Sequence, residues 1–154
     1  MLKAVSIVTK GMYFTVAILS HENSMIYGDL HSPVLKKSIQ FHDLTELILI
    51  MDKIMQDFNI PPEEGKHRSF TSSNKSIHIR LNYQDLRQDN FEENLDYSFM
   101  FPKKSKDIFT IKVMYRQNNT WQGEITWVDK EKTKFFRSAL ELIVLIYSIY
   151  YDNH

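Results

Sequence analysis

The chain has 154 residues, of which 43% are hydrophobic and 25% charged, as in an ordinary single globular domain. Its 19 basic and 19 acidic residues cancel, which argues against strong sequence-independent binding to nucleic acid, since such binding usually shows as a basic excess. Absence of cysteine excludes disulfides, thiolate metal ligands and cysteine nucleophiles. We therefore expect a cytoplasmic protein, and no uncharged apolar stretch reaches the length of a membrane span.

The first clear element is the stretch YFTVAILS, residues 13–20. Phe14, Val16 and Ile18 fall on one face at a period of two, which predicts a half-buried strand rather than a signal segment. A short strand is expected within LKKSIQF, residues 35–41, and a helix over residues 44–58. Asp43 and Glu46 form a capping-box pattern at the start of this helix, and Pro61-Pro62 should end it.

Residues 59–96 differ from the rest and form an insert, with one strand expected at SIHIRLNY, residues 76–83. Residues 97–102 are expected to be a strand that corresponds to the opening segment 2–9.

The stretch IFTIKVMYR, residues 108–116, predicts a second alternating strand, followed by a three-residue loop at 117–119 with an Asn in the left-handed conformation. This loop length pairs Tyr115 with Trp121, Val113 with Gly123, Ile111 with Ile125, Phe109 with Trp127, Met114 with Gln122, Lys112 with Glu124 and Thr110 with Thr126. Both tryptophans should then lie on the buried face, with Trp127 nearer an edge.

TKFF, residues 133–136, should be a short strand, followed by a helix over ALELIVLIYSIYY, residues 139–151, with Ser138 and Glu141 as its capping box. Like the helix over residues 44–58, which is apolar at positions 44, 47–51, 54 and 55, this helix is apolar around more of its circumference than packing on one sheet requires. Its surplus apolar side could pack on the other helix, on another subunit, or on both. The candidate interface residues are Val144, Tyr147, Tyr150 and Tyr151.

Residues 14–54 align without gaps on residues 109–149, and ten of the 41 positions are identical. We therefore predict an α+β fold with an internal duplication of a sheet-plus-helix unit of ββββα type, its helices packed on one sheet face. The single domain, 1–154, would comprise repeats 1–58 and 97–154 and the insert 59–96.

No catalytic, cofactor or metal site is predicted. The six histidines have no ligand spacing, the four glycines form no phosphate-binding loop, and no serine has a patterned histidine and acid partner. The matched Glu46 and Glu141 are explained by helix capping.

Two copies of ββββα, with similar helix starts FHDLTEL and FRSALEL, resemble the layout of PUR-repeat proteins, whose sheets bind single-stranded nucleic acid and whose helices pack together or dimerise. No diagnostic motif of that family is present. The resemblance implies binding through the polar sheet face, which carries the candidate residues Lys112, Met114, Arg116, Gln122 and Trp127.

The sequence favours a non-enzymatic protein-binding or assembly protein, a homodimer that acts through protein–protein contacts without a cofactor or membrane. The alternative is a single-stranded nucleic-acid-binding protein of PUR-like layout, with phosphate contacts from Lys112 and Arg116 and with His31 and Arg80 as further candidates. A small-molecule sensor is a third class.

Overall fold

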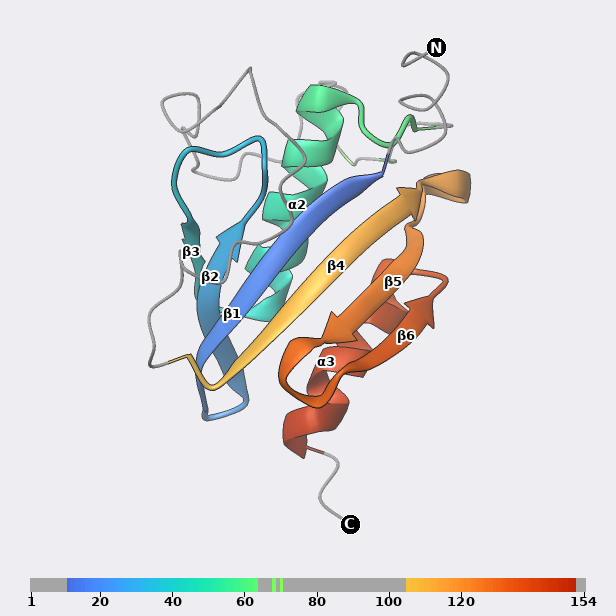
Figure 1. The fold of residues 1–154 in the computed structure, drawn as a ribbon. Coiled ribbons are helices and arrows are strands. Elements are labelled where there is room, and N and C mark those ends of the chain that lie inside the picture. Colours follow the sequence, from blue (N-terminus) through green and yellow to red (C-terminus); the bar gives the residue numbers. More distant parts are fainter. Residues whose placement is uncertain (1–10, 64–67, 69, 71–104, 152–154) are drawn as a thin grey trace.

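The computed structural model describes residues 11–63, 68, 70 and 105–151. Its elements are β1 (Met12–Glu22), β2 (Met25–His31), β3 (Ile39–Phe41), α2 (Leu44–Phe58), β4 (Asp107–Tyr115), β5 (Gln122–Trp127), β6 (Lys132–Phe136) and α3 (Ala139–Tyr151). The strands form one antiparallel sheet in the order β3-β2-β1-β4-β5-β6, with both helices on one face of it (Figure 1). The predicted α+β class is confirmed. The strands expected at 2–9, 76–83 and 97–102, and most of the insert 59–96, lie outside the described residues.

The centre of the sheet is the antiparallel pair β1–β4, in which Thr15 lies opposite Thr110. The hairpins β1–β2 and β4–β5 extend outward from this pair. The first hairpin is followed along the chain by β3 and α2, and the second by β6 and α3. The core lies between the sheet and the helices, where Phe14, Phe41, Phe109 and Phe136 are each 1% exposed or less.

The β4–β5 hairpin has the predicted register over most of its length, including Val113 with Gly123 and Lys112 with Glu124. Its loop is a 3-10 turn, Gln117–Asn119, in which both asparagines have positive φ. The predicted pairs of Tyr115 with Trp121 and of Met114 with Gln122 are wrong, because a bulge between Val113 and Tyr115 places Tyr115 opposite Gln122. A bulge also interrupts β1, between Ile18 and Ser20.

The bulge in β4 shifts the alternation by one residue. Tyr115 therefore turns to the outer face, where it is 57% exposed, and Arg116 turns inward, where it is 2% exposed. Arg116 Nε donates to the carbonyl oxygen of Pro61 at 2.7 Å and Nη2 to that of Met55 at 3.2 Å. The buried guanidinium thus contacts the carbonyl end of α2.

Both helices begin where the sequence predicts. Asp43 Oδ1 accepts from the backbone N–H of Glu46 at 2.7 Å, and Ser138 Oγ accepts from that of Glu141 at 3.0 Å. The helix α2 ends at Asn59, which adopts the left-handed conformation, so the expectation that Pro61-Pro62 ends it is corrected. The strand β3 covers only the last three residues of the predicted 35–41. No helix in the described part of the chain is long and apolar enough to cross a membrane.

Candidate functional site

The outer side of α3 carries a stripe of four apolar side chains, three of which are exposed. Leu140, Val144 and Tyr151 are 69%, 55% and 39% exposed. Tyr147 is half-buried and packs against the edge of the core, and its ring centroid lies 5.3 Å from that of Tyr151. The spacing of four, three and four residues aligns these four side chains along one side of the helix. We call Leu140, Val144, Tyr147 and Tyr151 the α3 stripe. Leu140 was not among the predicted interface residues, although it lies one turn before Val144.

The helix α2 is a useful comparison because it packs on the same sheet face and starts from an equivalent cap (Figure 1). Counted from the caps Asp43 and Ser138, the positions of the α3 stripe correspond in α2 to Thr45, Leu49, Asp52 and Gln56. Gln56 donates to Asp52 at 2.9 Å, and Lys53 lies beside Asp57 at 3.2 Å. Three of these four positions of α2 are therefore polar, as solvent contact requires, and only Leu49 is apolar. Packing on this sheet does not require an apolar outer side.

Tyr150, a fourth predicted interface residue, belongs to the core side of α3 and is only 9% exposed. Its hydroxyl donates to Asp107 Oδ2 at 2.7 Å, while Trp127 Nε1 donates to Asp107 Oδ1 at 2.9 Å. The ring of His21 lies 4.5 Å from that of Tyr150. Burial and the hydrogen bond to Asp107 raise the pKa of Tyr150 far above its usual range. These contacts attach the end of α3 to the sheet and hold Tyr150 on the core side of the helix.

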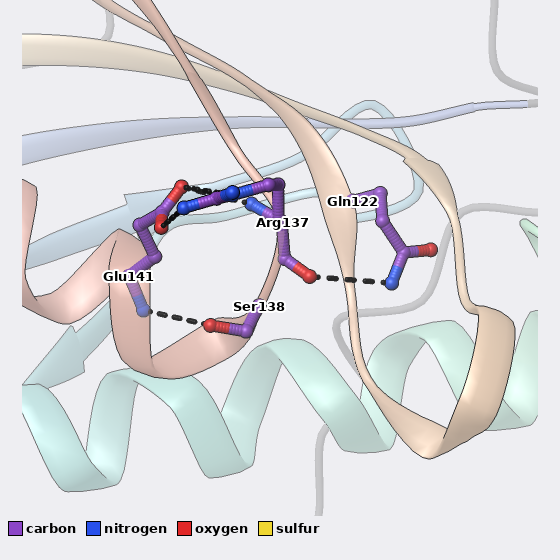
Figure 2. Close-up of polar contacts among 4 residues, drawn as sticks. All are labelled: Gln122, Arg137, Ser138 and Glu141. Atoms are coloured by element: carbon purple, nitrogen blue, oxygen red, sulfur yellow. Dashed lines mark hydrogen bonds and ion pairs between the residues drawn. The ribbon is translucent and has the colours of Figure 1, made fainter.

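The start of α3 is attached through a second set of polar contacts, shown in Figure 2. Arg137 Nη2 lies 3.0 Å from Glu141 Oε2, and this pair lowers the pKa of Glu141 and raises that of Arg137. Gln122 Nε2 donates to the carbonyl oxygen of Arg137 at 3.4 Å and to that of Gln117 at 3.3 Å. With both ends held, the helix presents the α3 stripe on a defined surface.

The predicted binding face on the sheet is only partly formed. Arg116 is buried beneath the end of α2, where desolvation lowers its pKa and the carboxylates of Glu63 and Asp52 oppose that shift. Trp127 is half-buried and bonded to Asp107, and the amide of Gln122 bonds the loop and the start of α3. The expectation that Arg116 is exposed on this face is therefore wrong. Lys112 and Met114 are half-exposed on β4.

A shallow hollow of about 190 Å³ lies on the outer face where β1, β4 and β5 meet. It is lined by Tyr13, Phe14, Thr15, Thr110, Ile111, Lys112, Glu124 and Thr126, and Lys112 Nζ lies 5.1 Å from the centroid of the Tyr13 ring.

Beyond the hollow, the outer face of β1 and β2 is largely closed to solvent. Thr15, Ala17 and His31 are 6%, 0% and 2% exposed. Burial lowers the pKa of His31 and raises that of Asp29. This half of the outer face is thus not an open binding surface.

No group of three or more metal-ligating side chains occurs within residues 11–63 and 105–151. A scan against models of protein families, a search of curated proteins and a search of solved structures found no match to the chain.

Proposed function

We propose that this protein is a non-enzymatic assembly module that forms a homodimer through the α3 stripe. The observation that carries the proposal is the contrast between the helices. At the four positions where α3 has Leu140, Val144, Tyr147 and Tyr151, α2 has a threonine, a leucine, an aspartate and a glutamine. Since the fold does not need apolar residues there, an interface is the simplest reason for them, because exposed apolar patches mark interaction sites.

A second copy of the chain is the partner that fits the stripe best. Glu141 is the only charged residue of α3, so two stripes can meet without bringing like charges together. A two-fold axis places the same patch on both sides of an interface. In an antiparallel pair of α3 helices, Leu140 at the start of the stripe meets Tyr151 at the end of the stripe of the other copy. Tyrosine suits such a boundary because its ring is apolar and its hydroxyl can remain hydrated.

The test exchanges the α3 stripe for the polar residues of α2, in the variant Leu140→Thr, Tyr147→Asp, Tyr151→Gln. Sedimentation equilibrium over about 1–200 µM would span the range in which an interface of this kind exchanges. We expect a dimer for the wild type and a monomer for the variant, with unchanged far-UV circular dichroism. Phe135→Gln is the matched control, since Phe135 is 69% exposed but lies on β6, and it should remain dimeric. A monomeric wild type, or a variant that stays dimeric, would refute the proposal.

We also propose that the two halves are copies of one unit, as the spacing of 95 residues implies. Three features support this: Thr15 and Thr110, which are 95 residues apart, lie opposite each other; the bulges lie 95 residues apart; and Gly28 and Gly123 meet equivalent neighbours. The PUR-like alternative is less well supported, because Arg116 and His31, two of its candidate phosphate contacts, are buried. Native mass spectrometry of protein purified without nuclease would reveal bound nucleic acid as added mass that nuclease removes.

A further inference from the structure

The strand β6 forms one edge of the sheet, and none of the described strands pairs with its outer side (Figure 1). Residues 132–135 are all exposed. An edge of this kind presents unpaired backbone N–H and C=O groups, to which an extended segment can add as a further strand. The opposite edge, β3, is shorter: it has three residues against five in β6, and two of the three are buried.

The two faces of β6 have different chemistry. Lys132 and Lys134 lie opposite Trp127 and Ile125, so they share the helix-side face of the sheet, but both are exposed. Thr133 and Phe135 lie on the outer face, opposite Thr126 and Glu124. Lysines alone would be an ordinary protection against edge-to-edge aggregation. Phe135 does not fit that explanation, because an aromatic side chain that is 69% exposed at an edge favours association.

The residue of β3 that corresponds to Phe135 is polar. Counted back from the buried phenylalanines Phe41 and Phe136, Phe135 corresponds to Gln40 of β3. Gln40 donates to the hydroxyl of Tyr27 on the neighbouring strand, so the polar edge of β3 is satisfied within the sheet. Phe135 therefore occupies a position where the same sheet tolerates a polar residue.

We propose that the edge of β6 binds an extended acidic peptide as a seventh strand of the sheet. A strand added beside β6 places alternate side chains next to the lysine row and next to the row of Thr133 and Phe135. The segment that fits both rows has acidic residues alternating with apolar ones. The strand contributes two lysines and no carboxylate, which makes its charge complementary to such a segment. This site is separate from the α3 stripe and goes beyond dimerisation.

The probe is a fluorescent peptide of sequence Glu-Val-Glu-Val-Glu-Val-Glu, titrated with the full chain and followed by fluorescence anisotropy. We expect saturable binding that weakens about fivefold in Phe135→Gln and in Lys134→Glu, because each removes one cross-strand contact. Lys37→Glu, the same charge reversal beside the other edge, should leave the affinity unchanged. A peptide with lysine for each glutamate, or with proline for the central valine, should not bind.

Several results would overturn the proposal: no saturable binding, equal binding of the proline peptide, or an equal loss of affinity in Lys37→Glu. If Phe135→Gln instead converted a wild-type dimer to a monomer, the occupant of the edge would be a second copy, and the acidic peptide would be rejected. The exchange variant of the α3 stripe should still bind the peptide. This result separates the two proposals, since either surface can fail without the other.

Discussion

Replacing Gly123 by alanine should destabilise the sheet strongly. A Cβ atom at this position would lie 2.0 Å from the carbonyl oxygen of Lys112 and 2.9 Å from Phe136 Cζ, whereas real Cβ atoms are essentially never closer than 3.0 Å to a neighbour. Strand β4 or β5 would have to move by about 1 Å, and the close packing of the core resists such a shift. Overpacking costs about 1–3 kcal/mol, and each ladder hydrogen bond that the movement breaks adds about 1 kcal/mol.

Alanine also lowers the conformational entropy of the unfolded chain, which by itself raises the free energy of unfolding by about 0.4–1 kcal/mol. The net loss in the free energy of unfolding is therefore about 2–4 kcal/mol, or a drop in Tm of roughly 5–15 °C for a chain of this length. Urea titration followed by tryptophan fluorescence measures it directly, because Trp121 is 3% exposed in the folded chain.

Alanine substitutions at two other glycines serve as comparisons for the stability loss of Gly123→Ala. Gly28→Ala should cost about as much, since its Cβ would lie 2.1 Å from the carbonyl oxygen of Ala17. Gly11→Ala should cost far less, because the closest atoms, one of them in the flexible side chain of Lys112, are 3.1 Å away. If Gly123→Ala were as stable as the wild type, the close strand approach described here would be wrong.

Three further predictions concern buried polar groups, and each is checked by urea unfolding. Arg116→Leu should lose about 2–4 kcal/mol, because the carbonyl oxygen of Pro61 loses its guanidinium donor and that of Met55 loses one of its donors; an unchanged stability would contradict the buried position. Asp107→Ala should lose about 2–3 kcal/mol by removing the acceptor of Trp127 and Tyr150, and Asp107→Asn should lose less. Burial lowers the pKa of His31, so the unfolded chain takes up its proton first, and stability should fall as the pH drops below about 6.5. The variant His31→Gln should lack that part of the decrease; an identical pH profile would refute it.

The helices and most of the β4–β5 register could be predicted from the sequence because their signals are local. Asp43 and Ser138 mark the helix starts, and the length of the 117–119 loop sets the strand pairing. The bulge in β4 could not be predicted, because Tyr115 and Arg116 both have apolar stems and polar tips and either can face the core.

The pairing of strands from the two halves of the chain also could not be predicted from the sequence. Nothing in the pattern of β1 or β4 specifies that these two strands join the halves at the centre of the sheet, since strand pairing between distant segments leaves no local mark. For the same reason the residues of the α3 stripe could be predicted only in part. Tyr150 and Tyr151 are adjacent aromatic residues, and only the direction of α3 relative to the sheet decides which of them is buried.

The central claim is that α3 meets α3 of a second copy, and a single engineered thiol tests it most directly. The chain has no cysteine, so Val144→Cys, near the middle of the α3 stripe, introduces the only thiol. A disulfide needs the two Cα atoms within about 7 Å. With Leu140 opposite Tyr151, Val144 lies beside Tyr147 of the other copy, and the two Val144 positions are offset by only three residues, about 4.5 Å along the helix axis. We predict rapid, complete formation of a disulfide-linked dimer under mild oxidation, while Thr45→Cys at the corresponding position of α2 stays monomeric on a non-reducing gel. Equal cross-linking of the two variants, or none in Val144→Cys, would contradict the account.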